Sequence, residues 1–102
     1  MLNEGRLDAA LARPRTMLGY IPEATLEELA ASLAVAIAKC HAFVDGNKRT
    51  AAVVSLMFLR LNEIEISASE QEIGDVFIAV ADGSLPEADL ASWFLEASLA
   101  SE

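Results

Sequence analysis

Two apolar segments near the middle of the chain carry the clearest periodic pattern. Within residues 25–40, apolar side chains recur at helical spacing and cover almost the whole circumference of the predicted helix: Leu26, Leu29, Ala30, Leu33, Ala34, Ala36 and Ile37. Thr25 precedes this run and Glu28 follows three residues later, which is the spacing of a capping box. Because a helix that is apolar nearly all round must be buried on most sides, we expect helix 25–40 at the centre of the fold.

A second apolar helix is predicted for residues 47–62. The stretch between the two helices, His41–Gly46, breaks the apolar pattern and ends in the turn dipeptide Asp-Gly. We expect Met57 and Phe58 of the second helix to lie in the core, together with Trp93 farther along the chain.

The N-terminal segment predicts a short helix over Leu2–Leu11, which the sequence Arg13-Pro14-Arg15 should stop. Residues 16–24 contain Gly19 and Pro22 and read as irregular or briefly extended. Within them, Met17–Ile21 could form a short β flap whose edge receives a target peptide as an added strand. A plain connecting loop fits the same residues equally well.

The C-terminal part predicts two more helices. Residues 64–67 alternate between apolar and polar and could be a short strand or an extended link. Ser69 and Glu72 form a second capping box, which opens a helix to about Ala81. Pro86 suits the first turn of a last helix that runs to about Leu99. The pattern predicts an all-α fold of about five helices around two central apolar ones, in a single domain over residues 1–102.

Charge is distributed unevenly along the chain. All seven Lys and Arg residues lie within residues 1–60, whereas residues 61–102 carry ten acids and no Lys or Arg, for a net charge of −9. A broad nucleic-acid surface needs a positive stripe, so we expect no direct nucleic-acid binding. A small cationic site around Lys48 and Arg49 remains compatible with this charge and suits a phosphate ligand.

The cysteine content and the lengths of the apolar runs bear on the cellular compartment and on membrane insertion. Cys40 is the one cysteine, which excludes an intramolecular disulfide and fits a reducing cytoplasm. Residues 1–15 contain no long apolar run of the kind that a signal peptide has. The longest apolar stretches, residues 29–38 and 51–59, are too short to span a bilayer, so we expect a cytoplasmic protein with no membrane contact.

Candidate chemistry is concentrated in His41-Ala-Phe-Val-Asp-Gly-Asn-Lys-Arg49. The second helix begins directly after Gly46, so its free N–H groups and partial positive charge face this loop. Basic residues in a first turn oppose the helix dipole at a cost of about 0.3–1 kcal/mol each, which an anionic ligand relieves. Gly46, Asn47, Lys48 and Arg49 are therefore candidates for a phosphate site.

Two residues of the loop could carry chemistry on such a phosphate. Asp45 could hold Mg²⁺ beside a nucleotide phosphate, and His41 could take a proton from an attacking hydroxyl. Taken singly, each feature has an ordinary alternative: His41 as a helix cap, Asp45 as a turn residue, the Lys-Arg pair as a solvated face. Their joint spacing favours phosphoryl or nucleotidyl transfer from a metal–nucleotide complex.

This stretch resembles the signature of the Fic/Doc superfamily. Fic proteins carry His-Pro-Phe-x-(Asp/Glu)-Gly-Asn-Gly-Arg, followed by a second Arg, and Doc (death-on-curing) proteins carry His-x-Phe-x-Asp-(Ala/Gly)-Asn-Lys-Arg. The present residues match the Doc form at every fixed position. Residues 7–14 and 81–94 also look like flanking segments of Doc-type proteins, so the resemblance covers nearly the whole chain.

The resemblance implies a role for each motif residue. His41 is the general base, and Phe43 is a buried anchor of the loop. Asp45 binds Mg²⁺ or orients the acceptor, while Gly46 and Asn47 contribute to the anion-binding turn. Lys48 and Arg49 hold the phosphates of ATP.

The resemblance also implies a reaction and partners. Doc-type toxins are kinases that phosphorylate elongation factor Tu and stop translation, and a Phd-type antitoxin neutralises them. Fic proteins instead transfer AMP to a hydroxyl. Lys48 replaces the second glycine of the Fic motif, and Ala52 stands where Fic proteins have the second arginine. Both departures favour the kinase over the AMP transferase.

One further departure concerns the N-terminus, since Doc-type proteins usually have an additional segment, including a helix, before the part that matches residues 2–14. An N-terminally short domain suggests two other outcomes, a homodimer or an inactive module that only binds partners.

Overall fold

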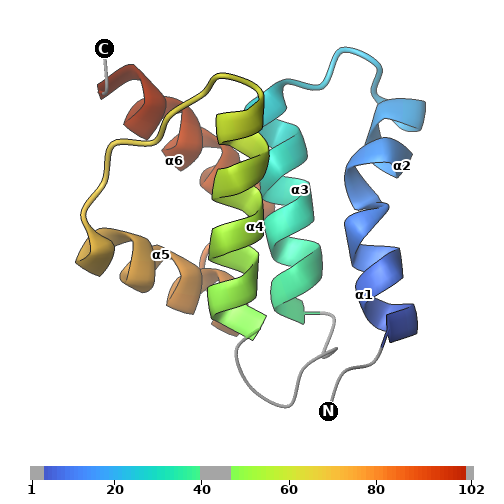
Figure 1. Cartoon of the computed structure of the whole chain (residues 1–102), viewed down its shortest axis with the longest axis horizontal. Coiled ribbons are helices and arrows are strands. Elements are labelled where there is room, and N and C mark those ends of the chain that lie inside the picture. Colours follow the sequence, from blue (N-terminus) through green and yellow to red (C-terminus); the bar gives the residue numbers. More distant parts are fainter. Residues whose placement is uncertain (1–3, 40–46, 101–102) are drawn as a thin grey trace.

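The computed structural model describes residues 4–39 and 47–100, and these form six α-helices (Figure 1). The predictions for residues 40–46 fall outside this part of the chain. In chain order the helices are α1 (Glu4–Leu11), α2 (Arg13–Tyr20), α3 (Leu26–Lys39), α4 (Asn47–Leu61), α5 (Glu70–Asp82) and α6 (Glu87–Ala100). The described part contains no strand, so the all-α prediction is confirmed.

Helix α3 is the centre of the fold, as its all-round apolar pattern predicts. It packs against each of the other five helices, and eight of its residues are buried: Leu29, Ala30, Ala31, Ser32, Leu33, Ala34, Ile37 and Ala38. The capping box at its start is present. The backbone N–H of Glu28 donates to Thr25 Oγ1 at 3.1 Å, and the N–H of Thr25 donates to Glu28 Oε1 at 2.8 Å.

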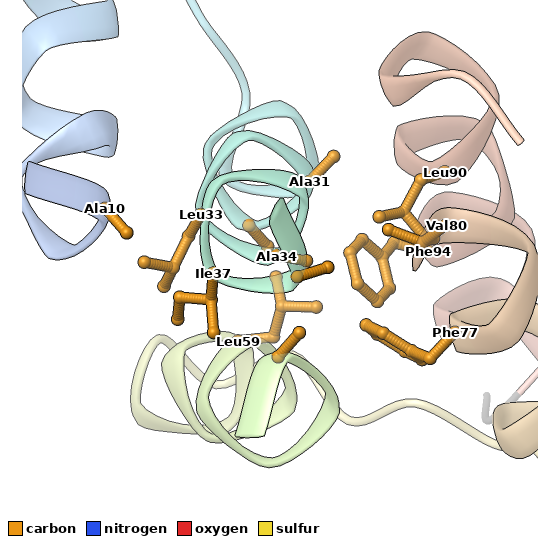
Figure 2. Packing of buried hydrophobic residues seen from close by; sticks show 13 residues of the cluster. Ala10, Ala31, Leu33, Ala34, Ile37, Leu59, Phe77, Val80, Leu90 and Phe94 are labelled. Carbon is orange, nitrogen blue, oxygen red and sulfur yellow. The ribbon is translucent and has the colours of Figure 1, made fainter. Parts of the chain in front are cut away.

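Small residues on α3 allow its neighbours to approach closely. Figure 2 shows Leu33 and Ile37 on the side toward α1 and α4, with Ala31 and Ala34 nearer to α6. Phe77 of α5 and Phe94 of α6 fill the space beside these alanines, with their ring centroids 6.4 Å apart (Figure 2). The core therefore combines a small-residue helix with large side chains from its partners.

Helix α4 packs mainly on α3 through one narrow stripe. Its buried residues are Ala51, Ser55 and Leu59, at successive i, i+4 positions. The hydroxyl of Ser55 donates to the carbonyl oxygen of Ala51 at 2.6 Å, which satisfies the buried polar group. The predicted central pair is present, since α4 packs on α3, although the rest of the circumference of α4 is only half-buried or exposed.

Helices α5 and α6 complete the core on the other side of α3. Ser69 caps α5 by accepting from the N–H of Glu72 at 3.1 Å, as predicted. The rings of Trp93 and Phe94 in α6 have centroids 5.5 Å apart and planes tilted by 54°. Trp93 also donates from Nε1 to Glu72 Oε2 at 3.2 Å, which joins α6 to the start of α5. The last helix begins one residue later than predicted, and Pro86 supplies the carbonyl oxygen that accepts from Leu90.

Helix α5 ends at Gly83, whose φ of 86° is the left-handed conformation that favours glycine. Beyond it, the hydroxyl and the backbone N–H of Ser84 hydrogen-bond to the exposed carboxylate of Asp82 and hold the pKa of Asp82 below its usual value of 3.8. The N–H to Oδ1 distance is 2.8 Å. This cluster is a local helix ending and lies outside the predicted site.

The N-terminal prediction needs correction. The predicted end of the first helix at Leu11 is confirmed, but Arg13 and Pro14 then begin a second helix, α2. Proline is tolerated in a first turn because the N–H groups there have no partner within the helix. The segment predicted as irregular or as a β flap is helical up to Tyr20, and the N–H of Ile21 donates to the carbonyl oxygen of Met17 at 2.7 Å. A strand edge at residues 17–20 is therefore absent.

Residues 64–67, after α4, form an extended link, which is one of the two alternatives that their apolar–polar alternation predicts. Ile64 and Ile66 are half-buried against the core, while Glu65 and Ser67 are exposed. The N–H of Ser67 donates to the carbonyl oxygen of Ala97, which fastens the link to α6.

The radius of gyration is 12.8 Å, close to the ~13 Å typical of a compact chain of this size. None of the described helices has the length and apolar character needed to cross a membrane.

Candidate active site

The structure places three of the predicted site residues at the start of α4. Asn47, Lys48 and Arg49 form its first turn, with Asn47 half-buried and both cationic side chains exposed. The remaining predicted residues lie outside the described part of the chain, which leaves their positions as predictions: His41, Phe43, Asp45 and Gly46.

The two helix ends that flank the motif lie close together. Helix α3 ends at Lys39 and α4 begins at Asn47, and the two helices pack side by side. Figure 1 shows the C-terminal end of α3 and the N-terminal end of α4 at the same end of this pair. The fold therefore holds both ends of the motif on one packed helix pair, which is the kind of support that a phosphate site needs.

The first turns of α4 and α2 carry cations and no acid: Lys48 and Arg49 in α4, and Arg13 and Arg15 in α2. Helices α3, α5 and α6 each carry two acids in their first turn, the arrangement that the helix dipole favours. Helix α4 has no acid there and instead carries Lys48 and Arg49. The positive end of the helix dipole and two exposed cations thus coincide at the start of α4, which can bind phosphate oxygens.

Ala52 shows what lies one turn farther along α4. It is half-buried and packs against the core. Its methyl group offers no hydrogen-bond donor. The cationic side chains near the start of α4 are therefore those of Lys48 and Arg49.

A groove of the described surface lies elsewhere. Its volume is about 700 Å³, and it lies between α2, the start of α3 and α6. The start and end of α3 are separated by roughly 20 Å at 1.5 Å per residue, so the groove is remote from the motif. Sequence patterns gave no sign of it, because its lining comes from three separate segments: Met17, residues 25–28 and residues 87–95. Within residues 4–39 and 47–100, no group of three or more His, Cys, Asp or Glu side chains could hold a metal ion.

Comparison with known proteins agrees with the motif. Residues 2–59 match the Fic/DOC family. The chain is 34% identical over 91 residues to "Protein kinase doc" of Escherichia phage P1, which covers 89% of this chain and 71% of that protein. It is 45% identical over 65 residues to "Toxin Doc" of Mycolicibacterium smegmatis, covering 63% of this chain and 50% of the relative. The chain therefore belongs to the Fic/DOC family and is a member of its Doc type.

Proposed function

We propose that this chain is the toxin of a toxin–antitoxin pair and transfers the terminal phosphate of ATP to a hydroxyl of a protein. The observation that carries the proposal is the acid-free first turn of α4, where Lys48 and Arg49 are exposed beside the end of α3. A site of this kind binds the phosphates of a nucleotide. The similarity to a protein named "Protein kinase doc" supports the same reaction class.

The motif residues have distinct roles in this proposal. Lys48, Arg49 and the N–H groups of α4 bind phosphate oxygens and offset the negative charge of the transferred group. His41 takes the proton of the acceptor hydroxyl as its oxygen attacks phosphorus. The bond between the terminal phosphorus and the bridging oxygen breaks, and ADP leaves with that oxygen.

We propose that Asp45 binds Mg²⁺. A carboxylate oxygen is the ligand type that Mg²⁺ prefers, and one or two carboxylates together with nucleotide phosphates are its usual protein environment. The metal ion neutralises phosphate charge when it is bound. Phe43, Gly46 and Asn47 are proposed to fix the loop and its anion-binding turn.

Two residues favour phosphate transfer over AMP transfer. Lys48 adds a long cation at the phosphate site, where the Fic motif has a glycine. Ala52 packs on the core at the position of the second Fic arginine, so this position supplies no second phosphate clamp. AMP transfer is the alternative reaction, and the mass gained by the target distinguishes it from phosphate transfer.

Elongation factor Tu is the proposed target and a Phd-type antitoxin the proposed partner. Both are carried over from the resemblance of the motif to Doc-type toxins, and the relative named "Toxin Doc" supports a toxin function in general. The proposed site of action is the cytoplasm, where translation takes place.

A growth assay tests whether the motif carries the toxicity. Expression of the chain should arrest bacterial growth, and His41→Ala should restore growth because no other residue replaces the proposed base. Glu96→Ala, an exposed change on α6 outside the motif, should remain toxic. Circular dichroism of the purified variants checks that both keep their helices.

Two outcomes would count against the proposal. Continued toxicity of His41→Ala would remove His41 as the base. Absence of toxicity from the unmodified, folded chain would favour a module that only binds partners.

A further inference from the structure

The groove between α2, the start of α3 and α6 has the size of a small-molecule site. Its volume of about 700 Å³ lies within the range of roughly 300–1,000 Å³ that ligand pockets have. Helix α2 packs on α1 and α3 but not on α6, and the groove separates α2 from α6. It lies at the start of α3, whereas the motif follows the end of this helix.

The side chains that α6 and α2 contribute to the groove are small or apolar. Ala88, Ala91 and Leu95 follow one another at i, i+3 and i+7 positions, so they lie on one side of α6. Met17 of α2 is half-buried. The hydroxyl of Ser92, which also lines the groove, donates to the carbonyl oxygen of Ala88 at 3.2 Å and is satisfied within α6. This part of the groove therefore suits an aliphatic chain.

Three carboxylates line the same groove: Glu27 and Glu28 at the start of α3, and Glu87 at the start of α6. No Lys or Arg is among the described residues that line it. Glu28 acts in the capping box, where its Oε1 accepts from the N–H of Thr25 at 2.8 Å. Glu27 and Glu87 have no such role, since neither carboxylate forms a hydrogen bond or an ion pair with a described residue.

Glu27 and Glu87 also differ from the other acids in burial. Both are half-buried, whereas every other acidic side chain whose exposure the structure describes is exposed. The helix dipole favours an acid in a first turn, but Glu70 and Glu72 in the first turn of α5 are exposed. Partial burial of an unpaired carboxylate removes water from a charge without compensation. A cation bound in the groove would supply that compensation.

The extent of the groove favours a small ligand over a protein. Nine residues line it, whereas a stable protein–protein interface takes about 20–30 residues from each partner. An apolar surface together with carboxylates from two separate helices is complementary to an aliphatic chain that carries more than one cation.

We propose that this groove binds an aliphatic polyamine. The methylene groups of the ligand would contact the apolar side chains of α2 and α6, and its ammonium groups would pair with Glu27 and Glu87. Such a ligand would connect α2 with α6, which do not pack on each other, and its binding should stabilise the folded chain. The proposal does not depend on phosphate transfer, so the two can fail separately.

Calorimetric titration of the purified chain with spermidine at low ionic strength tests the proposal. We expect saturable binding of one spermidine per chain and a Tm that rises with the spermidine concentration. Glu27→Gln combined with Glu87→Gln removes both half-buried carboxylates and should weaken binding about tenfold. Ser92→Trp leaves the charge unchanged but places a large ring in the groove, so it should weaken binding by a similar factor.

The matched control is Glu70→Gln combined with Asp75→Asn, which removes two charges from exposed positions of α5. It should bind spermidine as the unmodified chain does, which separates the groove from the general attraction of polycations to a chain of net charge −9. Circular dichroism checks that every variant keeps its helices.

Three results would each overturn the proposal. The first is the absence of saturable spermidine binding by the unmodified chain. The second is binding by either groove variant that is as tight as binding by the control. The third is tighter binding of a trilysine peptide with blocked ends than of spermidine, which would assign the groove to a basic protein segment.

Discussion

At the scale of single residues, Lys48 and Arg49 are the informative pair. Helix propensity and the helix dipole both allow an acid at these positions, and the neighbouring helices α3, α5 and α6 carry acids in their first turns. Lys48 and Arg49 at the start of α4 oppose the helix dipole at a cost of about 0.3–1 kcal/mol each, which a bound anion would offset. Helix α2 begins with Arg13 and Arg15 in the same way, so the motif together with this cost is the reason to propose a ligand at Lys48 and Arg49.

Replacement of Lys48 should weaken nucleotide binding. We expect Lys48→Ala to raise the Kd for ATP–Mg²⁺ about tenfold, since a charge-assisted hydrogen bond at an exposed site contributes roughly 1.4 kcal/mol. Isothermal titration calorimetry measures the change. Arg60→Ala is the matched control, because it removes a cation from the other end of the same helix. An unchanged Kd for Lys48→Ala would take this residue out of the phosphate site.

Ser32 is a second residue with a measurable consequence. It is fully buried in α3, and its hydroxyl has no hydrogen-bond partner among the described residues. Burial of an unpaired hydroxyl is unfavourable, and alanine has the higher helix propensity. We expect Ser32→Ala to raise the free energy of unfolding by about 1 kcal/mol in urea denaturation. A loss of stability would show that the hydroxyl makes a stabilising contact.

At the scale of elements, α4 has a buried side and an exposed side. Its buried stripe of Ala51, Ser55 and Leu59 holds it on α3, and this contact fixes where the first turn lies. On the opposite side Val53, Met57 and Leu61 are more than half exposed. Substitutions on the two sides of this helix should therefore differ in their effect on stability.

Two leucines of α4 test that separation. Leu59 is fully buried and Leu61 is 78% exposed. Leu59→Ala should lower the free energy of unfolding by about 2–5 kcal/mol through lost burial and a cavity. Leu61→Ala should change it by less than about 0.5 kcal/mol. Urea denaturation of both variants gives the comparison, and similar losses for the two would contradict the burial pattern.

At the scale of the whole molecule, sequence patterns predicted the helical class and the boundaries of most helices. Thr25 with Glu28 and Ser69 with Glu72 located two helix starts because capping is a local interaction. The start of α2 at Arg13 was missed, since Pro14 can either stop a helix or open one.

Burial was harder to predict than helix position. Phe58 and Trp93 pack against the core as expected, whereas Met57 is exposed. Apolar residues cover so much of α4 that composition alone does not tell which side faces α3. That choice is made by tertiary packing. For the site, the sequence motif remains the main guide to His41 and Asp45, and the structure adds the placement of Asn47, Lys48 and Arg49.

The most direct test of phosphate transfer by this chain is the intact mass of elongation factor Tu after incubation with the purified chain and ATP–Mg²⁺. We expect the target to gain the mass of one phosphate, and we expect this gain to disappear with His41→Ala. A gain of the mass of one AMP would contradict the account and assign the chain to nucleotidyl transfer. An unchanged mass of elongation factor Tu, with a folded and ATP-binding chain, would contradict the proposed target.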